Sequence, residues 1–273
     1  MIPQIVFSML LSIGIFVLAF NLEVGKMGLG SNLNALMIVL GGTFSATLIA
    51  YPLKQLIWTA HLLRKAFSSR NDIDWTIDAI VALARAYRKG GIRALEQMAE
   101  EIPDGLLKTG VDLIAYNYTK EKIDQILEKE ARISHSRYET AYKILYNMAR
   151  LAPALGLTGT IVYLIRVFGH ITDSQGLVGY MAIALLSTFY GVVFANLCFI
   201  PLANKLREFM DQEQVHFELI QEGILDIHDA ENPSAMEYKL EALSMTSFKP
   251  SLAPSRSKLL VVSSQKQASS VAS

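Results

Sequence analysis

Residues 151–203 read LAPALGLTGTIVYLIRVFGHITDSQGLVGYMAIALLSTFYGVVFANLCFIPLA, and this stretch decides the fold. It contains two apolar runs, Leu151 to Ile171 and Leu177 to Ala203, which a short polar linker separates. A helix needs about 20 apolar residues to cross a ~30 Å hydrocarbon layer. Each run is long enough, so the stretch predicts a hairpin of two membrane-spanning helices.

Two further apolar runs precede this hairpin, Ile5 to Leu22 and Leu33 to Leu53. The first is unlike a signal peptide, because no Lys or Arg precedes it and a second span follows almost at once. We interpret it as a retained membrane helix. Across the chain 52% of residues are hydrophobic and 18% are charged, against about 25% charged in soluble domains. The composition therefore excludes an ordinary soluble domain.

Basic residues beside the runs set the predicted orientation. They follow the second run, precede the third and follow the fourth, at Lys54, Arg64, Lys65, Arg70, Arg150, Lys205 and Arg207. The linkers 23–32 and 172–176 hold only Lys26. Since cytoplasmic loops of membrane proteins carry the excess of Lys and Arg, both termini and the middle segment are expected in the cytoplasm.

The predicted fold is an all-α integral membrane protein with four transmembrane helices and a large helical cytoplasmic insert between the second and third. The expected boundaries are 1–53 for the first two helices, 54–150 for the insert, 151–204 for the last two helices, 205–249 for a cytoplasmic helical region and 250–273 for a disordered tail. Within the insert, Gly90 and Gly91 should break one helix, and Pro103 should end the next. No breaker lies between Arg132 and Arg150, so the third membrane helix should continue into the cytoplasm.

Sequence patterns of enzymes and cofactor sites are missing. GLGS at 28–31 lacks the rest of a phosphate-binding loop, so we interpret it as a turn between spans. The histidines have no metal-ligand spacing, and no nucleophile elbow occurs. Lys and Arg balance Asp and Glu at 25 each, which gives no field for nucleic acid. We expect a protein that is not an enzyme and that uses neither cofactor nor resident metal.

Small residues line one face of each of the last two runs. They are Ala152, Gly156, Gly159 and Thr160 in the third run and Ala184, Thr188, Gly191 and Ala195 in the fourth. Such stripes indicate close packing, either between spans of one subunit or against a partner's helix. For a partner helix the packing positions would be Gly156, Gly159, Ala184, Gly191 and Ala195. The hydroxyls of Thr160 and Thr188 could also offer oxygens to an ion.

None of the four runs contains Asp or Glu, since Glu23 and Asp173 lie at their outer ends. A proton relay or sodium site in hydrocarbon commonly needs a carboxylate, because neutral hydroxyls neither carry a proton at ordinary pH nor neutralise a cation. The chain therefore has the composition of half an ion path, whose carboxylate must come from another subunit.

Several motifs resemble the MotA/PomA family of flagellar motor stator subunits. They are LGGT at 40–43, RKGG at 88–91 followed by ALE at 94–96, APALG at 152–156 with GT at 159–160, MAIALLSTFYG at 181–191 and PLANKL at 201–206. The resemblance covers about residues 1–245 in order and spacing. ExbB and TolQ are more distantly similar and arrange their spans differently.

The resemblance implies a multi-pass protein of the bacterial inner membrane, surrounded by lipid. Five copies would enclose a dimer of a MotB/PomB-like B subunit, whose membrane helix supplies the missing aspartate. Passage of Na⁺ or H⁺ would turn this ring, and the insert would press on the rotor switch protein FliG. No nucleic acid is implied as a partner.

Residue by residue, the resemblance implies that Arg88 and Glu96 contact the rotor, with Lys89 as a further candidate. It implies that Pro153 and Pro201 are gating or helix-orienting prolines, and that Thr160 and Thr188 line the ion path. From the residues alone, Arg88 and Glu96 are better explained as a solvated helix face, and Pro153 can be explained as a simple cap or kink.

The identity of the coupling ion is predicted from hydroxyl content. Threonine at both 160 and 188 is typical of sodium-driven members, whereas many proton-driven flagellar members have Ala at the position of Thr160. ExbB and TolQ nevertheless use protons with comparable threonines, and Arg150 replaces an acidic residue usual in PomA-type chains. Tyr163 and Arg166 also depart from the family pattern. We favour sodium, with an ExbB/TolQ-like energiser of a non-flagellar complex and a non-conducting scaffold as alternative functions.

Overall fold

The computed structural model describes residues 29–68, 73–103, 105–169 and 174–248. The first apolar run, most of the 23–32 linker and the 250–273 tail lie outside the described residues. Every element within them is a helix, and the chain divides into two units. The first unit takes in residues up to Arg70 together with Arg132–Gln212, and the second takes in Asn71–Ala131 together with the chain from Glu213 onward.

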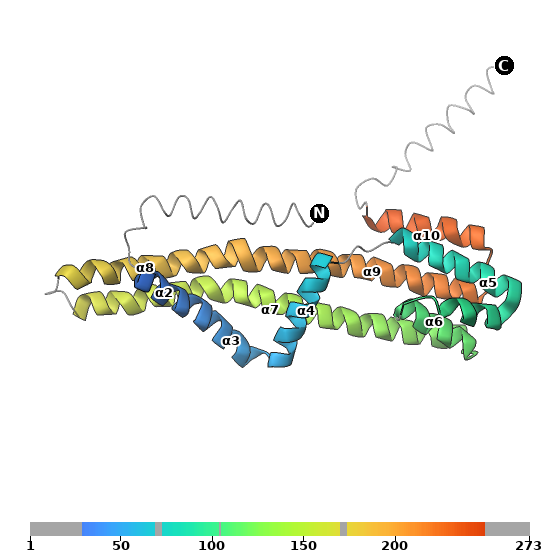
Figure 1. Cartoon of the computed structure of the whole chain (residues 1–273), viewed down its shortest axis with the longest axis horizontal. Helices are drawn as coiled ribbons and strands as arrows, with labels where there is room; N and C mark the ends of the chain where they lie inside the picture. The colour runs from blue at the N-terminus through green and yellow to red at the C-terminus, as the bar shows by residue number, and fades with distance from the viewer. Residues whose placement is uncertain (1–28, 69–72, 104, 170–173, 249–273) are drawn as a thin grey trace, which may run out of the picture. The chain divides into compact units, whose positions relative to one another are not determined.

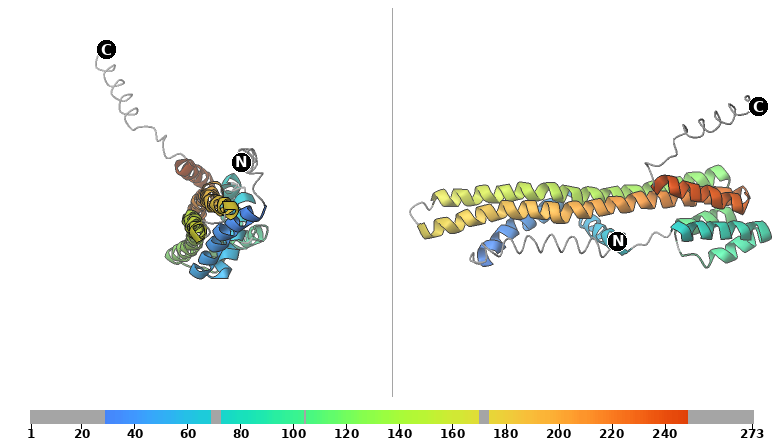
Figure 2. Two further views of the ribbon diagram at one scale, coloured as in Figure 1. Left: turned by 90° about the vertical axis from the view of Figure 1, so that its left-hand side faces the viewer. Right: turned by 90° about the horizontal axis from the view of Figure 1, so that it is seen from above.

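Two long helices dominate the first unit. Helix α7 (Lys120–Gly169) lies beside α8 (Ser174–Phe194), which continues through the π-helix η2 (Ala195–Phe199) into α9 (Ile200–His228), as Figures 1 and 2 show. The prediction that the third apolar run continues into the segment before it is confirmed, because α7 is unbroken from Lys120.

Within the described residues, three helical segments are long and apolar enough to span a membrane. They are Leu33–Ala50, a window inside α7, and a window inside the continuous helix Leu177–His228. They coincide with the second, third and fourth predicted runs.

The second run forms α2 (Leu29–Leu36), the π-helix η1 (Met37–Gly41) and α3 (Gly42–Ala50). The turn predicted at 28–31 was wrong for Leu29 to Ser31, which lie in α2. A single glycine costs a helix only about 1 kcal/mol, which the adjoining apolar run outweighs.

Helix α3 ends at Ala50, three residues before Leu53, the predicted end of the run. Tyr51 has extended backbone angles, φ −134° and ψ 138°, because Pro52 disfavours the helical conformation in the residue before it. The amphipathic helix α4 (Leu53–Ser68) follows and forms a V with α3 in Figure 1.

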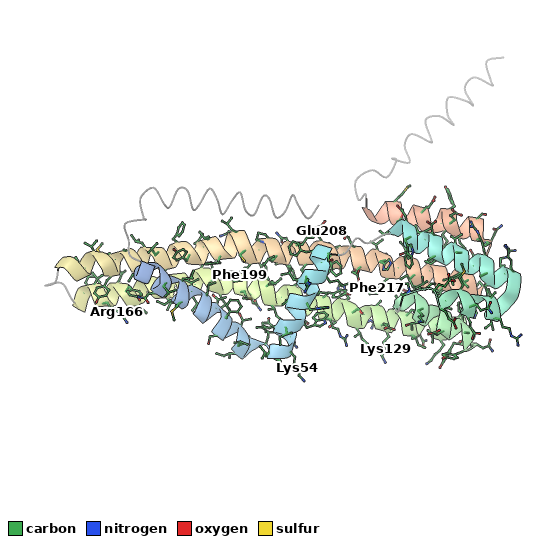
Figure 3. The ribbon with its side chains drawn as sticks, viewed as in Figure 1. Lys54, Lys129, Arg166, Phe199, Glu208 and Phe217 are labelled. Atoms are coloured by element: carbon green, nitrogen blue, oxygen red, sulfur yellow. The ribbon has the colours of Figure 1, made fainter. Side chains whose placement is uncertain are left out.

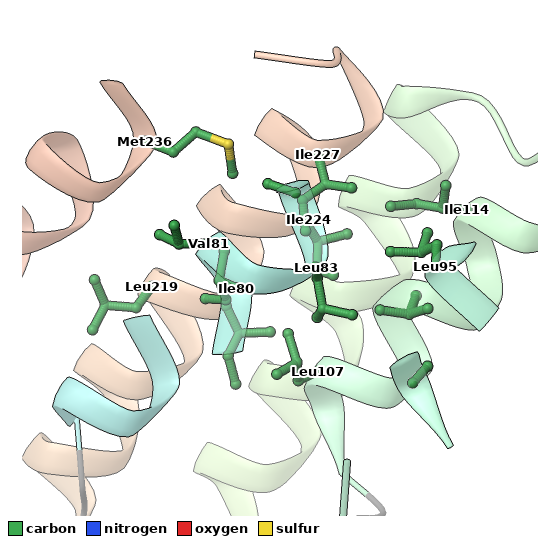
Figure 4. Packing of buried hydrophobic residues seen from close by; sticks show 14 of the residues in the cluster. Ile80, Val81, Leu83, Leu95, Leu107, Ile114, Leu219, Ile224, Ile227 and Met236 are labelled. Atoms are coloured by element: carbon green, nitrogen blue, oxygen red, sulfur yellow. The ribbon is translucent and has the colours of Figure 1, made fainter. Parts of the chain in front are cut away.

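The second unit is a small helical bundle with its own core. It contains α5 (Ile73–Ala99), α6 (Leu106–Ala115), α10 (Pro233–Phe248) and the adjoining parts of α7 and α9. Figure 4 shows Ile80, Leu83, Leu95 and Ile224 in this core, and all four are fully buried. Gly91 has a φ of 65° and breaks α5, and no helix spans Pro103, as predicted.

A charge cluster joins α9 to α10 in the second unit. The ammonium of Lys239 pairs with Glu222 and lies 2.9 Å from Oδ1 of the buried Asp226. Burial raises the pKa of Asp226 against the lowering effect of Lys239. Burial lowers the pKa of Lys239, but hydrogen bonds to both carboxylates outweigh this and raise it overall. Lys239 therefore stays charged across the physiological range.

Candidate functional site

Helices α7 and α8 touch backbone to backbone at Gly156 and Gly191. A Cβ on Gly156 would lie 2.7 Å from the Ser187 carbonyl oxygen, and one on Gly191 would lie 2.6 Å from the Ala152 carbonyl oxygen. Both distances are too short for any side chain, so only glycine permits this approach. These glycines therefore pack the spans of one chain, which is the first of the two interpretations of the small-residue stripes.

The rest of the stripe is also buried within the chain. A Cβ on Gly159 would lie 2.7 Å from Cβ of Ser187, which is itself fully buried. Ala184 and Ala195 are each 2% exposed and belong to separate apolar clusters. That these residues also pack on a partner's helix stays a prediction.

The close approach brings the two predicted ion-path threonines together. The hydroxyl oxygens of Thr160 and Thr188 are 2.5 Å apart, and that of Thr160 is 2.9 Å from the Ala184 carbonyl oxygen. A hydroxyl has one proton and two lone pairs. The pair is satisfied when Thr188 donates to Thr160 and Thr160 donates to Ala184.

This arrangement leaves lone pairs on both hydroxyls as acceptors. Thr188 lies 3.5 Å from the Gly156 carbonyl oxygen, too far to compete for its proton. Both lone pairs of Thr188 and one of Thr160 then remain available. The two oxygens, each partly buried, can ligate a cation, but their neutral hydroxyls cannot balance its charge.

The two predicted gating prolines lie at different kinds of helix irregularity. Pro153 is inside α7, and its Cα would be 3.1 Å from a Cβ on Gly191. Pro201 is the second residue of α9, which begins where the π-helix η2 ends. Proline has no N–H, so each leaves the carbonyl four residues earlier without its usual helical donor. Both could orient helix segments around the threonine pair, and their gating role stays a prediction.

Arg166 is held at one end of this unit, where Figure 3 labels it. Its guanidinium carbon lies 5.1 Å from the centre of the Tyr163 ring, and that ring stacks on Tyr180 at 6.5 Å. Tyr163 is buried, so a cation–π contact anchors the arginine on a fixed ring. Tyr163 and Arg166, which both depart from the family pattern, therefore form one cation–π contact.

Arg150 lies in a cleft of about 330 Å³ at the other end of the span. Its lining residues are Thr47, Ala50, Tyr51, Asn147, Arg150, Leu151 and Ala154. The amide of Asn147 donates to the hydroxyl of Tyr51 over 2.5 Å, tying α7 to the end of α3. Arg150, which replaces an acidic residue usual in PomA-type chains, therefore places a positive charge at this cleft.

The residues predicted to contact the rotor are exposed on α5 in the second unit. Arg88 and Lys89 precede the break at Gly91, and Glu96 follows it. Exposure fits both a solvated face and a contact surface, so their role stays a prediction.

Sequence reasoning gave no site role to three buried hydroxyl residues. Ser187 donates to the Ile183 carbonyl over 2.9 Å, and Thr43 and Thr47 donate to carbonyls four residues earlier on their own helix. The spacing of Thr43, Thr47 and Tyr51 by four residues was the signal, because it places them on one helix face.

Comparison with known proteins gives consistent results. The model of the MotA/TolQ/ExbB proton channel family matches residues 98–219. Chemotaxis protein PomA of Vibrio alginolyticus is 31% identical over 218 residues, which are 80% of this chain and 85% of PomA.

Two solved structures share the fold. That of C. jejuni MotAB has a TM-score of 0.79 at 22% identity, covering 89% of this chain and 96% of that one. The flagellar MotAB stator complex from Bacillus subtilis has a TM-score of 0.71 at 28% identity, covering 87% and 98%.

Proposed function

We propose a function for this chain, which belongs to the MotA/TolQ/ExbB proton channel family and has PomA among its relatives. It is the A subunit of an ion-driven flagellar motor stator in the bacterial inner membrane. The observation that carries this proposal is the hydroxyl pair of Thr160 and Thr188, held by glycine contacts in spans that have no acidic residue.

The missing acid defines the partner. A cation in hydrocarbon needs a compensating negative charge, which the two hydroxyls cannot provide. A MotB/PomB-like B subunit supplies it as a membrane aspartate, and five A subunits surround a dimer of B subunits. The flagellar MotAB stator complex from Bacillus subtilis, at 28% identity, supports a MotB-like partner.

Torque leaves the complex through the second unit. Arg88, Lys89 and Glu96 contact charged residues of the rotor protein FliG, and complementary charge sets the register of this transient contact. Both termini of the A subunit lie in the cytoplasm.

Sodium is the proposed coupling ion. Na⁺ must exchange its water shell for several oxygen ligands, whereas a proton needs only the partner's carboxylate. Lone pairs on Thr160 and Thr188 offer such oxygens.

The test is the swimming speed of cells whose only stator is this chain with its B subunit, measured across a sodium series at constant proton-motive force. We expect speed to rise with sodium, and Thr160→Ala to require more sodium for the same speed. Thr158→Ala is the matched control, because the exposed Thr158 hydroxyl only donates to its own helix, 2.9 Å from the Ala154 oxygen. Sodium-independent speed would assign the proton, and cells that assemble the complex but do not swim would refute the flagellar role.

A further inference from the structure

A basic cleft opens in the first unit between α4 and α7. Its volume is about 370 Å³. Its lining residues are Lys54, Gln55, Trp58, Thr59, Arg137 and Thr140. Figure 3 labels Lys54 near the start of α4. The cleft is separate from the threonine pair and has no part in the proposed ion path.

Two cations in this cleft have no anionic partner among the described residues. Neither Lys54 nor Arg137 forms an ion pair there, and nearby Glu139 pairs with Lys143 at 2.8 Å. The hydroxyls of Thr59 and Thr140 donate to carbonyls of their own helices, at 2.7 and 2.9 Å. The donors that remain are the ammonium, the guanidinium and the Gln55 amide, which together suit an anion.

One wall of the cleft is fixed by aromatic packing. Trp58 stacks on Tyr138 with ring centres 6.1 Å apart and planes 11° apart, and Tyr138 packs edge-on against the buried Phe209. On the same helix Leu53 and Ile57 are 61% and 63% exposed. An amphipathic helix with exposed aliphatic residues beside lysine has the composition of a segment at a membrane surface.

The cleft lies close to the end of the second candidate span, where basic residues gather in the sequence. The second span ends at Ala50, four residues before Lys54. On α7 the exposed Tyr146 stacks with Tyr142, as expected of interfacial aromatic residues. Thr140 is six residues from Tyr146, or about 9 Å along the helix. Arg137 is three residues further from Tyr146, and its long side chain also lines the cleft.

We propose that this cleft binds the phosphate of an anionic phospholipid from the cytoplasmic leaflet. Lys54 and Arg137 hold the phosphate from opposite sides, Gln55 adds a neutral donor, and Leu53 and Ile57 contact the acyl chains. The lipid then fixes α4 against α7. The proposal requires that α3 and α7 span a membrane but not that the chain conducts ions, so its failure leaves the proposed function standing.

The test is native mass spectrometry of the purified full-length chain, delipidated and titrated with phosphatidylglycerol or phosphatidylcholine. We expect preferential retention of phosphatidylglycerol. Lys54→Gln and Arg137→Gln should each weaken that retention about fivefold, which is the ~1 kcal/mol contributed by one basic residue near an anionic surface. The matched control is Arg64→Gln, which removes an exposed cation of α4 outside the cleft.

Further variants separate charge from folding and lipid from soluble phosphate. Lys54→Arg and Arg137→Lys keep the charge and should retain the lipid as the wild type does. The proposal is overturned if these variants lose as much retention as the glutamine variants, or if Arg64→Gln loses as much as Lys54→Gln. It is also overturned if inorganic phosphate displaces phosphatidylglycerol as well as added lipid does, since the site would then serve a soluble phosphate.

Discussion

Replacing Gly191 with alanine tests the contact on which the threonine pair depends. The added Cβ would lie 2.6 Å from the Ala152 carbonyl oxygen and 3.1 Å from Cα of Pro153. Both are backbone atoms and cannot rotate away as a flexible side chain could. The two helices must therefore move apart, which also separates Thr160 from Thr188.

The expected cost follows from two opposing effects. Overpacking of a close contact costs about 1–3 kcal/mol. Alanine gains about 1 kcal/mol over glycine in a helix, so the net loss is up to ~2 kcal/mol. Gly179→Ala is the matched control in the same helix, because a Cβ there meets nothing within 4 Å among the described residues. It should leave stability unchanged or raise it.

The assay is thermal unfolding of the full-length chain in one detergent, followed by helical circular dichroism. We expect Gly191→Ala to melt below the wild type, and cells carrying it with the B subunit to swim more slowly. Equal melting temperatures for Gly191→Ala and Gly179→Ala would refute the reasoning, because they would mean that α7 and α8 do not touch at this glycine.

Two further predictions concern the second unit. Lys239→Met should destabilise the chain at neutral pH, because it leaves buried Asp226 without its cation. An unsatisfied buried group costs about 1–3 kcal/mol, and the 40% exposure of the lysine lowers that cost here. Burial raises the pKa of Asp226, so the folded variant takes up a proton at a higher pH than the unfolded chain does. As the pH falls through this range, chemical denaturation should show that the variant's loss of unfolding free energy relative to the wild type becomes smaller. Arg88→Glu should slow swimming without changing the amount of assembled complex, whereas Lys129→Glu, an exposed reversal on α7, should not. Normal swimming of Arg88→Glu would show that Arg88 does not contact the rotor.

Local features of the fold could be predicted from the sequence. The length of an apolar run fixes a membrane helix, and three predicted runs coincide with candidate spans. The break at Gly91 follows from a residue that tolerates a positive φ. The end of α3 was misplaced because apolar residues continue past Pro52 to Leu53, whereas the backbone restriction acts on Tyr51.

Contacts between distant residues could be predicted only in part. The spacing of small residues indicated close packing, but it could not say that Gly156 meets Gly191 within one chain. The sequence motifs singled out both Thr160 and Thr188, but the hydrogen bond between them depends on the contact between α7 and α8. The cleft that combines Lys54 with Arg137 has no sequence signal, since it depends on how α4 packs against α7.

Ion flux through proteoliposomes tests most directly whether the chain is one half of an ion path. Three preparations are compared with empty liposomes: the chain alone, the chain with its B subunit, and the same complex with the B subunit's membrane aspartate changed to asparagine. We predict flux only from the complex that keeps the aspartate, because the four apolar runs of this chain contain no carboxylate. Flux from the chain alone above that of empty liposomes would contradict the proposed function.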